Sequence, residues 1–316
     1  MAAVAAAVRA EVAIVRMAAR RAGGVIRISW VGLPWRVSSD SISCMAQDLL
    51  SDITSRHVPR WVAPVIADFE MFGRDVVSVN DVATALGVAS DSRRLKNAIH
   101  LLVRLGWLRP LPSRGTYEFL LARSGPYPGG DPLVEARAVR AKRPDFKLAI
   151  VGSGAAFLRG FSERAPSQYT VAIDHGQGGS VALAAGYDVV KTTLERIADI
   201  PDLRDVPVSD AAHLLADAAL WPAAAGDLRD ADHWLRRALK ATEPAAAAVI
   251  ARRVGLAAAA RMAYLASKFD APVVAVAVAA TLHGRARTSI GQAGARIVAR
   301  DPALGVDDRL GVATLG

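Results

Sequence analysis

Apolar residues recur at helical spacing between residues 61 and 105, and short β-like runs follow them. Together with residues suited to helix caps, this pattern predicts a helix that opens at 58–61 and ends at Gly73, an extended link at 76–79, helices at 81–86 and 91–105, and strands at 107–111 and 116–119. A helix, a short helix, a turn, a further helix and a hairpin in this order are typical of a winged helix-turn-helix domain. In such domains the last of these helices enters the major groove of DNA, and the hairpin (the wing) lies along the backbone or the minor groove.

A cluster of chain-breaking residues at 125–132 predicts a linker, and the pattern beyond it mixes strands with helices. The predicted strands are 146–151, 169–173 and 187–193, with a Gly-rich turn at 175–180 before the last of them. The predicted helices are 134–143, 152–160, 210–220 with Ser209 as its cap, 228–240, 244–254 and 256–269. The valines of 272–280 favour a final strand over a short buried helix.

The predicted fold class is therefore α+β, with an N-terminal winged helix-turn-helix domain followed by a mixed α/β, largely helical C-terminal domain. We expect the first domain at residues 45–124 and the second at 131–316. Residues 1–44 are Ala-rich and hard to interpret, and we treat them as an extension, with Met45 as an alternative start.

Composition narrows the class of protein. Of the 316 residues, 52% are hydrophobic and 22% are charged, which excludes a disordered chain. A single cysteine, Cys44, excludes an intramolecular disulfide and a cysteine-based zinc site. The longest apolar stretch, 271–282, is shorter than the roughly 20 residues of a membrane helix. We therefore expect a cytoplasmic protein that does not associate with membranes.

The net charge of +9 is concentrated in the predicted DNA-binding elements. Residues 91–115 contain six basic residues and one acid, Asp91. The polar face of the 91–105 helix and the hairpin tip supply the predicted DNA contacts, which are Arg93, Arg94, Lys96, Asn97, His100, Arg104 and Arg114. Arginine suits phosphates and guanine, and asparagine suits adenine. The alternative is a merely solvated helix face. The basic helix at 134–143 could likewise contact the DNA backbone or simply connect the two domains.

A search for catalytic chemistry yields no site. Gly152–Ser153–Gly154 begins a dinucleotide-binding motif, but Phe157 stands where the third glycine is needed. Nucleotidyl transfer needs two carboxylates one residue apart, and Asp174 has Gly176 at the second position. His213 and His233 are interpreted as ordinary helix residues among apolar neighbours. We therefore expect no catalytic residue, no metal site and no cofactor, and hence no enzyme.

Several segments carry a resemblance to a known family. They are Val103–Phe119, with its Arg-x-Gly-Trp-Leu and Arg-Gly-x-Tyr sequences, Asp131–Pro132, Ala149–Phe161, Ser167–Ala172 and Val206–His213. The first closely resembles the wing of bacterial AbiEi-type antitoxins, and Gly154, Ala156 and Gly160 resemble the element that opens the C-terminal domain of that family. The resemblance covers about residues 58–270.

The resemblance implies a function. Antitoxins of this type are encoded beside a nucleotidyltransferase-like toxin, bind inverted repeats in the promoter of their own operon and repress it, while the C-terminal domain takes part in countering the toxin. The expected partners are thus double-stranded DNA and the cognate toxin, contacted directly or countered functionally. Inverted repeats need two copies of the domain, so dimerisation on DNA is expected as one arrangement. The alternative function is a ligand-responsive winged-helix regulator whose C-terminal domain is a sensor.

Overall fold

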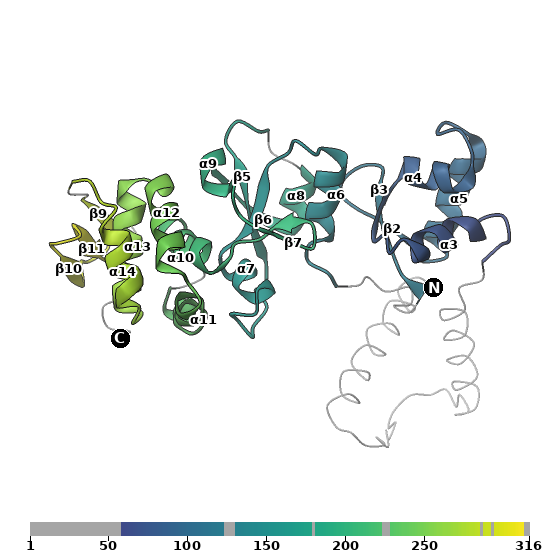
Figure 1. The fold of residues 1–316 in the computed structure, drawn as a ribbon. Coiled ribbons are helices and arrows are strands. Elements are labelled where there is room, and N and C mark those ends of the chain that lie inside the picture. Colours follow the sequence, from purple (N-terminus) through teal and green to yellow (C-terminus); the bar gives the residue numbers. More distant parts are fainter. Residues whose placement is uncertain are drawn as a thin grey trace, which may run out of the picture. The chain divides into compact units, whose positions relative to one another are not determined.

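The computed structural model describes residues 58–122, 130–178, 181–222, 228–284, 287–291 and 294–312 (Figure 1). The chain is a mixed α+β protein made of helices and small sheets, as its sequence predicts. The expected extension at 1–44 and most of the predicted linker at 125–132 lie outside the described residues. Within the described part, no helix is both long and apolar enough to cross a membrane.

The amino-terminal region, residues 58–122, has the predicted element order. Its helices are α3 (Ala63–Met71), α4 (Val79–Leu86) and α5 (Arg93–Arg104), and its strands are β1 (Val76–Ser78), β2 (Leu108–Pro110) and β3 (Thr116–Phe119). The strands form an antiparallel sheet in the order β1-β3-β2, so the predicted extended link is an edge strand that pairs with the hairpin.

Side chains from all three helices and the sheet form a separate core in this region. Phe69 of α3 meets Phe119 edge to face, with ring centroids 5.4 Å apart, and Trp107 stacks on Phe119 at 6.1 Å. Trp107 is therefore a core residue, as its position before β2 indicates. Trp61 departs from its predicted place on the buried face, because it is 37% exposed.

The carboxy-terminal region, residues 130–312, begins with α6 (Val134–Lys142) and a three-stranded sheet. Its strands are β4 (Leu148–Val151), β5 (Tyr169–Asp174) and β6 (Tyr187–Thr192), in that spatial order. β4 runs antiparallel to β5, but β5 and β6 are parallel. Parallel neighbours need a crossover, which here contains the helix α8 (Val181–Gly186) where the sequence predicts only a turn. The first connection contains α7 (Gly152–Leu158).

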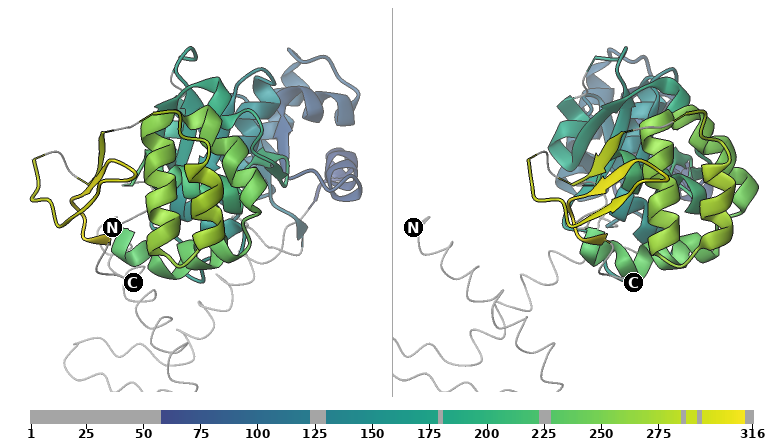
Figure 2. Two further views of the ribbon diagram at one scale, coloured as in Figure 1. Left: turned by 60° about the vertical axis from the view of Figure 1, so that its left-hand side comes forward. Right: turned by 90° about the vertical axis from the view of Figure 1, so that its left-hand side faces the viewer.

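The remaining elements of this region are mostly helices. They are α9 (Leu194–Ile197), α10 (Ala211–Leu220), α11 (Leu228–Lys240), α12 (Pro244–Val254), α13 (Leu256–Lys268) and α14 (Pro272–Ala279), with strands β7 (Asp202–Leu203), β8 (Val206–Pro207), β9 (Thr288–Ile290), β10 (Ala299–Asp301) and β11 (Val306–Asp308). The last three strands form a small sheet beside α13, drawn in yellow in Figure 2. Tyr264 of α13 is tied to it, because its hydroxyl donates to buried Asp308 over 3.0 Å.

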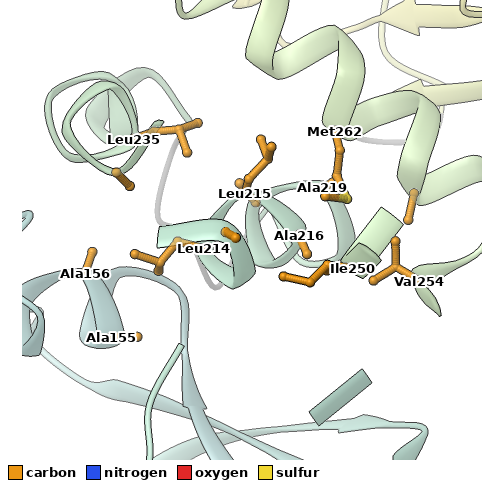
Figure 3. Packing of buried hydrophobic residues seen from close by; sticks show 14 of the residues in the cluster. Ala155, Ala156, Leu214, Leu215, Ala216, Ala219, Leu235, Ile250, Val254 and Met262 are labelled. Atoms are coloured by element: carbon orange, nitrogen blue, oxygen red, sulfur yellow. The ribbon is translucent and has the colours of Figure 1, made fainter. Parts of the chain in front are cut away.

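Helix α10 is the centre of the larger core. Its residues 212–219 are all buried, and it packs against α7, α11, α12 and α13. Figure 3 shows Leu214 and Leu215 of α10 among side chains from these neighbours, including Leu235 and Met262. Many of the residues in contact are alanines, whose small side chains allow helices to approach closely. The abundance of alanine in the sequence is thus used in helix packing.

Two predictions for this region are wrong. Residues 272–279 form helix α14, because Pro272 suits a first helical turn and the buried valines, Val274 and Val278, are four residues apart. A strand would have buried every second residue, whereas Val276 is 70% exposed. The cap of α10 is Asp210, whose carboxylate accepts from the His213 backbone N–H, and not Ser209.

Candidate nucleic-acid interface

Local sequence fixes the start and the orientation of α5. The Ser92 hydroxyl accepts the backbone N–H of Leu95 over 3.2 Å and so caps the first turn. Leu95, Ala98 and Leu102 are at most 1% exposed and lie on one side of the helix. Because these three positions repeat at intervals of three and four, the opposite side of α5 must face solvent.

The predicted DNA-contacting residues of α5 occupy that opposite side. At 100° per residue, Arg93, Lys96, Asn97, His100 and Arg104 fall within one face, and all five are exposed. Arg94 lies at the edge of this face, with its guanidinium carbon 6.0 Å from the ring centroid of Trp61. We call these six residues the α5 polar face.

The α5 polar face carries uncompensated positive charge. Within the described ranges, no ion pair involves Arg93, Arg94, Lys96 or Arg104. Exposed cations elsewhere do find acids, as Arg74 does with Asp81 over 2.8 Å. Four cations on one helix repel each other at the distances of successive turns, and a polyanion would relieve this repulsion.

Helix α4 precedes α5 and has well-defined ends. Ser78 and Asp81 form a capping box, in which each side chain accepts the backbone N–H of the other residue. Gly87 ends the helix with φ +63°, a left-handed conformation that glycine adopts without strain. These two signals limit α4 to residues 79–86 and leave a short turn before α5. Helices α4 and α5 pack against each other.

The seventh predicted residue, Arg114, lies on a different element. It is exposed at the tip of the β2–β3 hairpin, and no described hydrogen bond or ion pair joins it to α5. The tip is held in place by its backbone, because the Arg114 carbonyl accepts from Lys142 Nζ over 2.7 Å and the Gly115 carbonyl accepts from the Val79 N–H over 3.1 Å. Arg109, also basic and nearby in sequence, is paired with Glu118 across the hairpin over 2.6 Å.

The basic residues of α6 are engaged within the protein. Arg137 pairs with Asp75, beside β1, and with Asp131, at 2.5 and 2.6 Å. Arg140 reaches Asp202 over 3.3 Å. Together with the bond from Lys142 to the hairpin, these contacts favour a connecting helix over a second DNA contact.

A buried polar cluster lies elsewhere, around α10. Asp217 is 3% exposed and accepts the Gly152 N–H over 2.9 Å. Burial raises the pKa of Asp217 to about 6, against the opposing effect of that hydrogen bond. Burial also acts on Asp210, but hydrogen bonds from the His213 side chain and backbone outweigh it and lower the pKa of Asp210 to about 2.

This cluster explains two features singled out in the sequence. In Gly152–Ser153–Gly154, the Asp217 carboxylate already occupies the first amide of α7, the position where a dinucleotide site would hold phosphate. His213 is buried and hydrogen-bonded to Asp210 over 2.8 Å, and His233 is an exposed residue of α11. Among the described residues, no group of three or more His, Cys, Asp or Glu is placed to hold a metal ion.

Comparison with known proteins supports the fold alone. No protein-family profile matches the sequence, and no curated protein matches it either. The crystal structure of the RV2827C protein from Mycobacterium tuberculosis is similar to this chain, with a TM-score of 0.66 and 22% sequence identity. The similarity covers 83% of this chain and 95% of that chain.

Proposed function

We propose that residues 58–122 are a winged helix-turn-helix domain that binds double-stranded DNA. The order α3, β1, α4, α5, β2, β3 and the sheet order β1-β3-β2 support this, since α4 and α5 then form the helix-turn-helix and β2–β3 the wing. In this arrangement α5 enters the major groove.

The single observation that carries the proposal is the α5 polar face. Its four cations are exposed and have no acidic partner among the described residues, while Asn97 and His100 add hydrogen-bonding groups between them. Arginine and lysine would neutralise phosphates, and Arg93 and Asn97 have the chemistry to bind guanine and adenine edges. Arg114 would add a contact from the wing.

We further propose that the protein is an antitoxin of the AbiEi type. In this proposal it represses its own toxin–antitoxin operon in the bacterial cytoplasm by binding promoter inverted repeats, and it counteracts a nucleotidyltransferase-like toxin. The resemblance of the hairpin and of the β4–α7 segment to that family supports it. Two copies on DNA would match the two halves of an inverted repeat.

The DNA proposal is tested by a salt titration of binding to the DNA upstream of the gene. Each phosphate contact contributes about −0.9 to the slope of log affinity against log salt. The triple variant Arg93→Ala, Lys96→Ala, Arg114→Ala should bind much more weakly and with a shallower slope. The matched control is Arg164→Ala, Lys191→Ala, Lys240→Ala, which removes the same charge from exposed positions of the carboxy-terminal region. Equal affinity of the two triple variants would reject α5 as the binding element.

The antitoxin proposal has its own test. The gene next to this one should encode a nucleotidyltransferase-like protein that arrests growth when expressed alone, and co-expression of this chain should restore growth. Growth arrest that persists at equal expression would contradict the proposal. With the toxin expressed from an unrelated promoter, the triple variant should still restore growth, and this result would separate neutralisation from repression of the operon.

A second candidate function is that of a ligand-responsive regulator, with the carboxy-terminal region as the sensor. A hollow of about 370 Å³ in that region favours it. The two functions differ in their neighbours and in their response. A sensor needs no adjacent toxin gene, and its DNA affinity changes when a metabolite binds.

A further inference from the structure

A hollow of about 370 Å³ opens among four helices of the carboxy-terminal region. Arg196 of α9 lines it, together with Leu220 and Trp221 at the end of α10. The junction of α12 with α13 and Arg261, further along α13, complete the lining. The volume is at the lower end of the range typical of small-molecule sites. No part of the α5 polar face contributes to it.

Two half-buried arginines, Arg196 and Arg261, line this hollow. Arg196 Nη2 donates to the Val254 carbonyl over 3.2 Å, and Arg261 Nε donates to the Ala257 carbonyl over 3.3 Å. None of the described residues that line the hollow is acidic, whereas nearby Arg253 is paired with Asp199. Burial first, and then the like charge of Arg196, lower the pKa of Arg261. The pair therefore carries a repulsion that an anion would relieve.

The start of α13 adds to the positive potential. Gly255 is its N-cap and has no side chain to accept the amides of the first turn, whose residues Leu256, Ala257 and Ala258 line the hollow. Unpaired amides at a helix N-terminus favour negative charge, most strongly when cationic side chains point to the same place. Here the arginine pair supplies most of the charge and the amides extend it.

The remaining wall is apolar and partly aromatic. Trp221, Leu220 and Leu256 line it, and Trp221 also packs against the core beneath the sheet. A bare inorganic ion would leave this surface unused. A ligand with a ring would cover it by stacking on the indole.

We propose that this hollow binds a small phosphate-bearing molecule of the nucleoside monophosphate class. Its phosphate lies between Arg196 and Arg261 at the start of α13, and its ring lies against Trp221. Arginine suits this role because its planar fork can give two parallel hydrogen bonds to phosphate oxygens. The site is separate from the proposed DNA interface, so it stands or falls independently of DNA binding.

Calorimetric titration of the full chain at low salt tests the proposal. Adenosine 5′-monophosphate should bind saturably and more tightly than inorganic phosphate. Adenosine, which lacks the phosphate, should bind more weakly than the nucleotide. Arg261→Gln and Arg196→Gln should each weaken nucleotide binding roughly tenfold or more, the value of a charge-assisted hydrogen bond. The matched control is Arg164→Gln, because Arg164 is exposed and does not line the hollow.

A second measurement separates a binding role from a structural one. Because the two arginines repel each other when the hollow is empty, Arg261→Gln should keep or raise the melting temperature in chloride buffer and lose the increase that the nucleotide gives the wild type. Absence of nucleotide binding by the wild type, or equal binding by Arg261→Gln and Arg164→Gln, would overturn the proposal. A further outcome concerns the variant Arg93→Ala, Lys96→Ala, Arg114→Ala with nucleotide bound. If duplex DNA displaces the nucleotide from this variant, the hollow binds a nucleic-acid backbone, and the proposal is overturned.

Discussion

The buried carboxylate of Asp217 in α10 accepts the backbone N–H of Gly152, the first residue of α7, over 2.9 Å. This bond joins the helical part of the carboxy-terminal region to the β4–α7 turn, across 65 residues of sequence. A buried carboxylate is stable in its ionised form only where donors compensate for the loss of water. Here the compensation is incomplete, since burial still raises the pKa of Asp217 to about 6.

The first prediction concerns the pH dependence of stability. The pKa of Asp217 is higher in the folded protein (about 6) than the ordinary value of 3.8, so the folded state binds the proton more tightly. Its stabilising contribution is complete below 3.8 and is lost as pH rises through 6, by roughly 3 kcal/mol in total. Urea unfolding of Asp217→Asn should show a much smaller fall in the free energy of unfolding over this range than the wild type.

The neighbouring carboxyl supplies the control for that experiment. The pKa of Asp210 is lowered from 3.8 to about 2, so the stability it provides is present above 3.8 and is lost as pH falls from there through about 2. Asp210→Asn should therefore keep the decline at higher pH, moved slightly toward lower pH because the Asp210 charge also helps to raise the pKa of Asp217, and should remove part of the loss in strong acid. A fall in stability from pH 4 to 6 that is as large in Asp217→Asn as in the wild type would contradict the assignment to Asp217.

The second prediction concerns Gly154 in α7. A Cβ atom at this position would lie 2.7 Å from a ring carbon of Tyr169 on β5, so alanine would force the helix away from the strand. Gly154→Ala should destabilise the protein by about 1–3 kcal/mol in urea unfolding, as overpacking does elsewhere. Gly178→Ala is the matched control, because a Cβ there meets nothing within 4 Å. Equal effects of the two substitutions would show that α7 and β5 are not packed so closely.

The amino-terminal region was predictable because its signals are local. The apolar spacing of Leu95, Ala98 and Leu102 predicts the buried side of α5, and the same arithmetic places the cations opposite. Ser78 and Gly87 mark the ends of α4 through hydrogen bonds and backbone angles that involve only nearby residues. Where the determinants of an element lie within one or two turns, a single sequence contains them.

Elements that depend on distant partners were missed or assigned wrongly. Residues 272–279 contain valines that favour a strand, but packing on α12 and α13 makes them a helix. The crossover helix α8 and the short strands β7–β11 have little periodicity of their own. Strands of two or three residues form through hydrogen bonds to a partner strand, which their own residue pattern does not record.

The same distinction holds for the candidate sites. The exposed cations of α5 follow from helical spacing, but the internal partners of Arg109, Arg137 and Lys142 do not. The arginine pair of the hollow is 65 residues apart in sequence, with Arg196 on α9 and Arg261 on α13. A count of charges in a short stretch of sequence therefore identifies the exposed basic face of a helix. It does not show which cations are paired with acids, and it does not find sites whose residues are far apart in the sequence.

The third prediction concerns the attachment of α6 to the sheet of the amino-terminal region. Arg137 is 12% exposed at its side chain and pairs with both Asp75 and Asp131. Arg137→Ala should lower the free energy of unfolding by about 2 kcal/mol, because it removes a mostly buried cation that pairs with two carboxylates. Arg164→Ala, which removes an exposed arginine with no described ion pair, should change it by less than about 0.5 kcal/mol. An unchanged unfolding curve for Arg137→Ala would mean that these pairs do not hold α6 in place.

The last prediction separates two arginines five residues apart that contribute equally to the net charge. Arg104 lies on the α5 polar face without a described acidic partner, whereas Arg109 is paired with the largely buried Glu118 over 2.6 Å. Arg104→Gln should reduce the salt slope of DNA binding by about 0.9 and leave the stability nearly unchanged, as loss of one phosphate contact requires. Arg109→Gln should leave the slope unchanged and lower the free energy of unfolding by roughly 1 kcal/mol, because the pair contributes to the hairpin. Filter binding across a salt series and urea unfolding of both variants check the two halves of the prediction. If Arg109→Gln reduces the slope as much as Arg104→Gln does, the DNA contact depends on overall charge and not on the face that α5 presents to solvent.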